Sequence, residues 1–365
     1  MLHAQLQISL KNVAHNYRYF RSKLNDTTKL LILIKANSYG HGAVPFAQLM
    51  EDEGADYFGV ATPSEGVQLR QGGISLPILV LTTGLENYSL IMKNSLEPGI
   101  PNIIALEKLV EVMREEGIKS YPVHIKLDTG MHRLGFMEHE LAELKEFLQS
   151  HPQIIVKSIY SHLAASDEPE HDEFTLGQID AYERMSNDLI SILPNKPIRH
   201  ILNSAGIERF TQYQMDMCRL GVGIYGISPV EGTGLKPSAY FRCPILQLKQ
   251  LVKSDGTVGY GRRGKLYKTP HTIATIPVGY ADGIHRRLGK GKAKFEVNGK
   301  MVATIGNVCM DMCMLDVTGV DVKVGDVVTI FGDKPHANDL AKLMETIPYE
   351  IFTAIPARVE KVIID

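Results

Sequence analysis

The stretch LLILIKANSYGHG, residues 30–42, places one lysine at the end of an apolar run. The run before Lys35 has the length of a fully buried strand, and a polar, glycine-bearing loop with Tyr39 and His41 follows. A lysine inside such a strand would be a costly buried charge, whereas a lysine at its exit can face a cleft. Partial desolvation there lowers the pKa of an amine and makes it a nucleophile. The alternative is that Lys35 only marks the solvated end of the strand.

Short apolar segments recur at near-regular spacing through the first two thirds of the chain. They are KLLILIK (29–35), YFGVAT (57–62), PILVLTT (77–83), PNIIAL (101–106), VHIKLD (123–128), IIVKSIYSHL (154–163), RHILNSAG (199–206) and CRLGVGIYG (218–226). Charged amphipathic segments such as EKLVEVMREEG (107–117) lie between them. Eight strands alternating with helices predict an α/β fold, a closed (β/α)8 barrel of the TIM type, with a doubly wound open sheet as the alternative.

The pattern changes near residue 235. SPVEGTGLKPSAYFRCP (228–244) is punctuated by glycine and proline and is predicted to be a connector. The β-rich segments beyond it are ILQLKQLVK (245–253), TIATIPVGY (272–280), KAKFEVNGKMVATIG (292–306), MCMLDVT (312–318), DVVTIFG (326–332) and VEKVIID (359–365). We therefore expect a barrel at 11–235 and a mainly antiparallel β domain at 236–365. An alternating strand within residues 1–10 is expected to pair into that second domain.

Composition excludes several classes of function. At 365 residues the chain is long enough for two domains, and 44% hydrophobic with 22% charged residues is typical of a soluble globular protein. A net charge of -2 gives no basic surface for nucleic acid, and no apolar run is long enough for a membrane span. Four cysteines without a second Cys/His pair disfavour a zinc site, and no metal is expected. The expected location is the cytoplasm.

Polar residues follow the predicted strands, at the barrel end where chemistry is usually located. NSAG at 203–206 offers the Ser204 hydroxyl, and GVG at 221–223 offers backbone N–H groups that a phosphate can approach closely. Each signal alone could be ordinary tight packing. Together with Lys35 they suggest pyridoxal phosphate, held at its aldehyde by the lysine and at its phosphate by the last strands.

Six motifs in one order resemble those of alanine racemase, a fold-type III pyridoxal phosphate enzyme with an N-terminal barrel and a C-terminal β domain. The motifs are KANSYGHG (35–42), LDTGMHRLGF (127–136), RLGVGIYG (219–226), VGYG (258–261), VGYADG (278–283) and CMDMCM (309–314). The resemblance covers nearly the whole chain. It implies interconversion of L- and D-alanine, with D-alanine supplied for peptidoglycan.

The resemblance assigns Lys35 and Tyr260 as the two catalytic residues. Lys35 matches the lysine that binds the cofactor and carries a proton on one face of the substrate Cα. Tyr260 matches the base on the other face. A phenol ordinarily titrates near about 10, so such a base needs cationic neighbours. Family members complete each site with this tyrosine and the CMDM loop of the other subunit, which implies a homodimer with shared sites.

Arg219 matches the arginine that contacts the pyridine nitrogen, and His200 matches the residue that supports it. A guanidinium only donates, so it discourages protonation of the ring and weakens the electron sink. Simple proton return is then favoured over side reactions such as transamination. Barrel-type decarboxylases resemble one another in an acidic residue at this position, so Arg219 favours a racemase.

The remaining matches concern the cofactor and the substrate. The predicted cofactor-binding residues are Lys35, Tyr39, His162, Asn203, Ser204, Arg219, Gly221 and Val222. The predicted substrate-binding residues are Arg133, Tyr280, Met310 and Asp311. A guanidinium fork such as that of Arg133 suits a carboxylate.

Three questions stay open at this stage. Lys126 matches a lysine that is carbamylated in some family members, but it could equally be a plain lysine paired with Asp128. Ala357 stands where some members have a tyrosine that binds the phosphate. A broad-specificity, serine or lysine racemase remains an alternative, since one methylene changes discrimination by only about 1–3 kcal/mol. Barrel-type decarboxylases and cofactor-binding barrels without a second domain are more distant alternatives.

Overall fold

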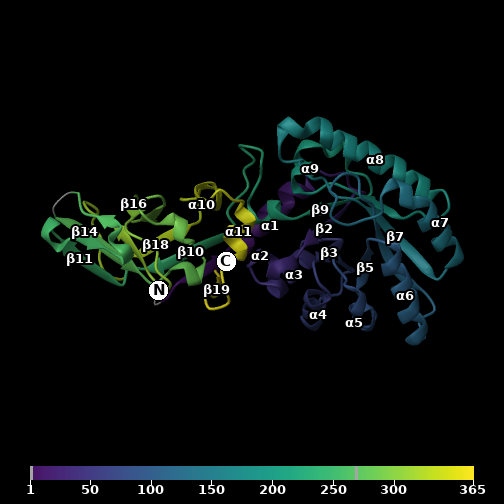
Figure 1. Ribbon diagram of the computed structural model, residues 1–365, viewed down its shortest axis with the longest axis horizontal. Coiled ribbons are helices and arrows are strands. Elements are labelled where there is room, and N and C mark those ends of the chain that lie inside the picture. Colours follow the sequence, from purple (N-terminus) through teal and green to yellow (C-terminus); the bar gives the residue numbers. More distant parts are fainter. Residues whose placement is uncertain (1–2, 268–269) are drawn as a thin grey trace.

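The computed structural model describes residues 3–267 and 270–365, which form two large sheets at opposite ends of an elongated molecule (Figure 1). A small two-stranded sheet pairs β12 (Thr257–Val258) with β13 (Gly264–Lys265). The first sheet has eight parallel strands in the order β8-β7-β6-β5-β4-β3-β2-β9. Its strands are β2 (Lys29–Leu33), β3 (Tyr57–Val60), β4 (Ile78–Val80), β5 (Glu97–Ile100), β6 (Tyr121–Lys126), β7 (Ile154–Tyr160), β8 (Ile198–His200) and β9 (Met217–Leu220). Backbone bonds from Asp216 N to Arg199 O (3.2 Å) and from Arg219 N to Leu202 O (3.0 Å) nearly close it into a barrel. The predicted (β/α)8 architecture is confirmed.

Helices follow the strands and cover the outside of the barrel (Figure 1). They are α1 (Leu10–Arg21), α2 (Lys35–Tyr39), α3 (Ala43–Asp52), α4 (Pro63–Gln71), α5 (Tyr88–Lys93), α6 (Ile103–Glu115), α7 (Leu141–Ser150), α8 (Asp172–Ile190) and α9 (Ser204–Arg209). The start of α1 shows how the sequence sets these boundaries. Ser9 caps α1 by accepting a hydrogen bond from Asn12 N, and Val13, Tyr17 and Phe20 form its buried face.

The fourth predicted strand, PNIIAL (101–106), is wrong. β5 ends at Ile100, and the apolar residues that follow form the first turn of α6. The Asn102 side chain accepts a hydrogen bond from Ala105 N at 2.9 Å and so caps this helix. The true strand contains Pro98 and Gly99, which are poor strand formers, so the stronger apolar signal lay just beyond it.

The second sheet has nine strands in the order β11-β14-β17-β16-β15-β18-β10-β1-β19. Its strands are β1 (Gln5–Ile8), β10 (Ala239–Pro244), β11 (Gln247–Leu251), β14 (His271–Ile276), β15 (Lys294–Val297), β16 (Lys300–Thr304), β17 (Cys313–Asp316), β18 (Val327–Phe331) and β19 (Glu360–Ile363). The pairing is antiparallel except between β1 and β19. The mainly antiparallel second sheet is confirmed, and β1 lies within it as expected. The exact division at residues 235 and 236 stays a prediction.

Two local features of this half show where the sequence was informative. Asn298 and Gly299 have φ of 48° and 74° and connect β15 to β16, as NG turns do in tight hairpins. The predicted connector at 228–244, in contrast, was too long, because its last six residues form β10. Proline at 244 suggested a break, but it ends the strand and leaves the alternating burial of residues 239–243 intact.

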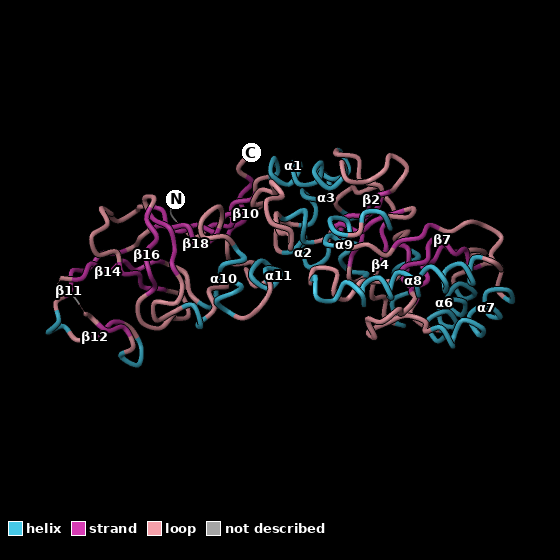
Figure 2. The backbone as a smooth tube through the Cα atoms, turned by 90° about the horizontal axis from the view of Figure 1, so that it is seen from above, coloured by secondary structure: helices cyan, strands magenta, loops and turns pink. Residues whose placement is uncertain are grey.

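Two helices of the second half reach toward the barrel. These are α10 (Ala337–Met344) and α11 (Pro348–Thr353), and α11 lies next to α2 in both views (Figures 1 and 2). α10 interrupts the β-rich half and buries Ala337, Leu340, Ala341 and Met344. No helix within residues 3–267 and 270–365 is long and apolar enough to cross a bilayer.

Candidate active site

Lys35 begins a turn with an unusual backbone conformation. Ala36, Asn37 and Ser38 have φ/ψ of 52/48°, 53/47° and 55/50°, and Tyr39 has φ of 51°. These are left-handed helical values, which are unfavourable by about 1–2 kcal/mol per residue with a Cβ atom. The turn therefore persists only because its surroundings hold it, and it carries Lys35 and Tyr39 directly after β2.

Contacts from three parts of the chain hold this turn. The Glu65 carboxylate accepts from Ala36 N at 2.6 Å, and Ser38 Oγ lies 2.8 Å from the Tyr225 hydroxyl. Gly40, with φ of 83°, ends the turn. A Cβ atom on Gly40 would lie 2.6 Å from the carbonyl oxygen of Phe352, so α11 packs directly on the turn. The second half of the chain thus helps to shape the barrel mouth.

The turn borders a cavity of about 370 Å³ at the carboxyl ends of β2, β8 and β9. All eight residues predicted to bind the cofactor line it: Lys35, Tyr39, His162, Asn203, Ser204, Arg219, Gly221 and Val222. A second lobe of about 400 Å³ shares Lys35, His162 and Arg219 with the first and adds Lys126 and Arg133. The structure therefore brings the barrel part of the predicted site together.

Arg219 is buried in the wall between the two lobes. Its Nη1 donates to His200 Nδ1 at 2.8 Å, and its Nη2 donates to the carbonyl oxygens of Ser161 (2.6 Å) and Ile201 (3.0 Å). His162 Nδ1 lies 3.3 Å from the same Nη2. These contacts fix the guanidinium plane, so the charge is presented to the cavity in one orientation.

The last strand ends in a glycine cradle. Ser204 Oγ accepts hydrogen bonds from Gly221 N (2.9 Å) and Gly223 N (3.2 Å), which ties α9 to the segment after β9. A Cβ atom on Gly221 would lie 3.2 Å from the Tyr39 hydroxyl and 3.3 Å from a Leu33 methyl group. Backbone and hydroxyl groups can therefore surround an anion here only because position 221 lacks a side chain.

Asn203 has a structural contact in addition to its place in the cavity wall. Its Oδ1 accepts from Gly206 N at 2.9 Å and caps α9, and it also accepts from Ser166 Oγ at 2.8 Å. The NSAG motif therefore positions the helix that carries Ser204.

The cationic groups of the cavity are tuned by burial and by one another. Burial and the charge of Arg133 lower the pKa of Lys35, against a smaller opposing effect of Glu65. Burial, with the charges of Arg133 and Arg219, lowers the pKa of Lys126 to about 8. Loss of hydration and the same cations hold the pKa of His162 well below its usual value. The lysine amines are thus more readily neutral and nucleophilic than exposed ones.

Tyr260, Tyr280, Met310 and Asp311 do not line either lobe. Tyr260 follows β12 (Thr257–Val258) in the chain, and β12 lies at the end of the molecule away from the barrel (Figure 2). Its side chain is 71% exposed, and those of Met310 and Tyr280 are 54% and 44% exposed. We call Tyr260, Tyr280, Met310 and Asp311 the Tyr260 patch.

Hydrogen bonds hold the loops that carry the Tyr260 patch. Asn307 Nδ2 donates to Tyr260 O at 2.9 Å, and Tyr280 N donates to Cys309 O at 3.0 Å. Arg358 donates to Asp282 and Asp311, each at 2.7 Å, and anchors the CMDM loop. An exposed patch of aromatic and thioether side chains on a rigid support is typical of an interaction surface.

Sequence reasoning missed Tyr349. This side chain lines both lobes, and its ring centroid lies 5.8 Å from that of Tyr39. Ala357, where a phosphate-binding tyrosine was expected in some relatives, is exposed and lines neither lobe. Tyr349 lies in the same segment, YEIFTAIPARV, and the packing of α11 on the Lys35 turn brings it to the cavity wall.

Comparison with known proteins gives one consistent result. Residues 8–229 match the family "Alanine racemase, N-terminal domain", and residues 239–363 match "Alanine racemase, C-terminal domain". Alanine racemase 1 of Clostridium acetobutylicum is 36% identical over 370 residues, which cover 98% of this chain and 94% of the relative. Alanine racemase 2 of Caldanaerobacter subterraneus is 34% identical over 371 residues, which cover 99% and 94%.

Solved structures agree with the sequence relatives. An alanine racemase of Clostridium difficile has a TM-score of 0.91 at 33% identity, with 100% of this chain and 96% of that chain covered. The enzyme from a D-cycloserine-producing Streptomyces lavendulae has a TM-score of 0.94 at 30% identity, with 100% and 98% covered. The chain therefore belongs to the alanine racemase family of isomerases.

Proposed function

We propose that this protein interconverts L- and D-alanine with pyridoxal phosphate held in the Lys35 cavity, in the cytoplasm, and supplies D-alanine for peptidoglycan. One observation carries the proposal: a lysine of lowered pKa, a fixed guanidinium and a glycine cradle line the same cavity in a chain of this family. In this proposal the lysine, the guanidinium and the glycine cradle correspond to the aldehyde, the ring nitrogen and the phosphate of the cofactor.

The donor set of the cavity suits pyridoxal phosphate. Lys35 would bind the aldehyde, and the Arg219 fork, which can only donate, would contact the ring nitrogen. The Tyr39 hydroxyl, Ser204 and the segment at Gly221 and Val222 would hold the phosphate. Burial raises the pKa of Tyr39, so this phenol stays protonated and can donate to an anion. When bound, the cofactor supplies an electron sink that acidifies the Cα–H bond of an attached amino acid.

Two bases are required to invert the configuration at Cα. We assign Lys35 to one face and the partner's Tyr260 to the other, so that one removes the proton and the other returns a proton from the opposite side. Tyr260 is 71% exposed and belongs to a patch outside the cavity of its own chain. A homodimer that places the Tyr260 patch over the Lys35 cavity covers the patch and completes two shared sites.

Arg133 is the proposed carboxylate ligand. It is exposed at the rim of the second lobe, where it can form a bidentate pair with a substrate carboxylate. From the partner, the Tyr260 patch would cover the same rim. Met310 is the member of the patch that we expect to limit the size of the substrate side chain, while Asp311 holds the loop through Arg358.

The direct test is turnover of L-alanine by the purified holoenzyme, followed by chiral chromatography. We expect D-alanine to accumulate to an equal mixture without release of carbon dioxide. A panel containing serine and lysine separates the alternative racemases. Carbon dioxide release, or no D-alanine with the cofactor bound, would contradict the proposal.

Lys126 is predicted to be a carbamate-forming lysine. With a pKa of about 8, roughly a tenth of its amine is neutral at pH 7, far more than for an ordinary lysine. The neutral amine attacks carbon dioxide and releases one proton, and the anion formed lies beside the charges of Arg133 and Arg219. In ¹³C NMR with labelled bicarbonate we expect a carbamate signal that Lys126→Met removes and Lys145→Met keeps. A signal that survives Lys126→Met would show that Lys126 is a plain lysine.

Tyr349 is predicted to take part in closing the phosphate lobe, since Ala357 does not reach it. Burial raises the pKa of Tyr349 to about 12, so its phenol also stays protonated. We expect Tyr349→Phe to weaken cofactor binding about tenfold, the size of one lost hydrogen bond to a charged group. Cofactor release followed by fluorescence measures this, with Tyr213→Phe as the control. Unchanged affinity would reduce Tyr349 to a packing role.

Gly221→Ala is predicted to weaken cofactor binding much more than Tyr349→Phe does. The added Cβ lies 3.2 Å from the Tyr39 hydroxyl and fills the cradle. We expect at least a hundredfold loss of cofactor affinity, measured by the same titration, with little loss of folded protein by circular dichroism. The control is Gly177→Ala on α8, where a Cβ atom meets nothing within 4 Å. Equal affinity of Gly221→Ala and wild type would exclude the cradle as the phosphate site.

A further inference from the structure

A chain of hydrogen bonds crosses the barrel interior from Arg219 to Glu97. Each of five neighbouring strands, β9, β8, β7, β6 and β5, contributes one side chain: Arg219, His200, Ser158, His124 and Glu97. Arg219 Nη1 lies 2.8 Å from His200 Nδ1, and His200 Nε2 lies 2.9 Å from Ser158 Oγ. Ser158 Oγ lies 2.6 Å from His124 Nδ1, and His124 Nε2 lies 2.7 Å from Glu97 Oε2. We call these five residues the relay.

The relay is almost completely buried. His124, Ser158 and His200 are 0% exposed, and Arg219 is 3% exposed. Strand register explains the continuity, because His124 is opposite Ser158 and side chains two residues apart share a face. Buried polar groups destabilise a core unless each one is hydrogen-bonded. The relay meets this condition, since both nitrogens of each histidine and the serine hydroxyl have partners within it.

The two ends of the relay fix its direction. Arginine can only donate and an ionised carboxylate can only accept. His200 Nδ1 therefore accepts from Arg219, and His200 Nε2–H donates to Ser158 Oγ. The Ser158 hydroxyl donates to His124 Nδ1, and His124 Nε2–H donates to Glu97. A second proton on His200 would point a donor at the Arg219 donor, so His200 is the neutral Nε2–H tautomer, and a neutral His124 ring is the Nε2–H tautomer as well.

The relay also joins a buried cation to a carboxylate. Within the described part of the chain, Arg219 has no ion pair, and its other acceptors include the carbonyl oxygens of Ser161 and Ile201. Glu97 is 13% exposed in its side chain. Burial raises the pKa of Glu97, but the hydrogen bond from His124 and the charge of Lys157 lower it, and the pKa lies below its usual value. Glu97 is therefore an anion, and it opposes the charge of Arg219 through three polarised side chains.

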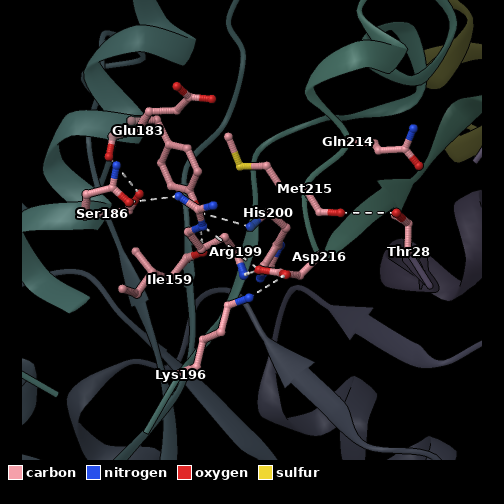
Figure 3. A network of polar contacts seen from close by, with 12 residues as sticks. Thr28, Ile159, Glu183, Ser186, Lys196, Arg199, His200, Gln214, Met215 and Asp216 are labelled. Carbon is pink, nitrogen blue, oxygen red and sulfur yellow. Dashed lines mark hydrogen bonds and ion pairs between the residues drawn. The ribbon is translucent and has the colours of Figure 1, made fainter. Parts of the chain in front are cut away.

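The backbone of His200 is held independently of its ring. His200 N donates to the Tyr182 hydroxyl at 3.0 Å, and Tyr182 in turn donates to Ile159 O at 2.6 Å. Next to it, Arg199 N donates to Asp216 Oδ2 at 2.9 Å (Figure 3). The main chain of β8 is thus fixed from both sides, and what remains free is the rotation of the imidazole. Arg219 sets its tautomer because it can only donate, and Ser158 holds its rotation.

We propose that Ser158, His124 and Glu97 are positioning residues that hold the His200 ring with Nδ1 toward Arg219 and so keep Arg219 oriented as a donor toward the cofactor nitrogen. The proposal rests on the proposed function, because it predicts how much alanine the enzyme racemises relative to the amount it converts to pyruvate. A guanidinium that tilts away from the ring nitrogen no longer discourages its protonation. The side reaction that converts alanine and the aldehyde cofactor to pyruvate and the amine cofactor should then increase.

The test compares wild-type holoenzyme with Ser158→Ala and Ser158→Thr. Histidine-selective ¹⁵N NMR reports the tautomers, and the ratio of pyruvate formed to D-alanine formed reports the side reaction. In Ser158→Ala we expect the His200 Nε2 signal to shift, because Nε2–H loses its acceptor and the ring is no longer held, and the ratio to rise about tenfold, the factor that corresponds to roughly 1.4 kcal/mol. Ser158→Thr keeps a hydroxyl and should restore both. Ser186→Ala on α8 removes another buried hydroxyl and should change neither.

Two results would overturn the relay. One is a wild-type spectrum in which His124 or His200 is an Nδ1–H tautomer. The other is a Ser158→Ala enzyme whose His200 signals and product ratio equal those of wild type. Failure of the proposed function is distinguishable, since an enzyme without D-alanine formation would still give the tautomer spectra. If Ser158→Ala does not fold, Glu97→Gln, which removes the anion at the far end, is expected to shift the same signals.

Discussion

Lys35→Ala is expected to abolish racemisation, with a loss of at least about 10⁴-fold in kcat/KM, because covalent anchoring and one of the two bases are lost together. The same variant should lose the visible absorbance of the bound cofactor. The physical reason is that Lys35 is a partly buried amine of lowered pKa that lines both lobes. Lys126 lines only the second lobe, and Lys342, which lines the first, is exposed on α10.

The measurement is an absorbance titration with pyridoxal phosphate, followed by chiral analysis of alanine. Lys145→Ala is the matched control, because Lys145 pairs with Asp188 on the outside of the barrel at 2.8 Å. It should keep both the absorbance and the activity. Retention of the visible band in Lys35→Ala would show that another lysine binds the cofactor.

Tyr260→Phe is expected to lower racemisation by about 10²–10⁴-fold, the usual contribution of a positioned acid or base, with little change in cofactor affinity. Only the phenolic oxygen is removed, and Lys35 still serves its own face. In deuterium oxide, exchange of the α-hydrogen should therefore persist for one alanine enantiomer and vanish for the other. Two separate bases therefore predict that inversion is lost for both enantiomers, while exchange is lost only for the one whose proton Tyr260 removes.

The control for this experiment is Tyr267→Phe, which alters another exposed tyrosine of the second half. It should leave racemisation and both exchange reactions unchanged. Equal exchange of both enantiomers by Tyr260→Phe would remove Tyr260 from the chemistry and leave a single base on both faces.

The sequence predicted the barrel well because its signal is local and repeated. Apolar runs that end in polar residues placed Lys35, His162 and Arg219 at strand ends, and the structure brings all three to one cavity. It failed at residues 101–106, where the apolar signal belonged to the first turn of α6. The sequence-based prediction was also wrong at β10, because Pro244 suggested a loop. This strand is stabilised by pairing with β1 and β18, which are distant in the sequence.

What the sequence could not provide was geometry between distant segments. Nothing in KANSYGHG indicates that four consecutive residues take left-handed φ values, because neighbours such as Glu65 and α11 impose them. Tyr349 likewise lines the cavity only because α11 packs on the Lys35 turn. The relay was equally invisible, since Glu97 and Ser158 carry no motif and meet only when the strands of the barrel are in register.

Mixing Lys35→Ala with Tyr260→Phe tests the central claim most directly, namely that each site combines Lys35 of one subunit with the partner's Tyr260. Each variant alone is expected to keep at most about 1% of wild-type activity. After the subunits are exchanged, half of the dimers are mixed, and each mixed dimer has one site with neither change, so about a quarter of wild-type activity should return. If both residues served the same site within one chain, every site in the mixture would keep one change. Activity that stays at the level of the separate variants would then contradict the account.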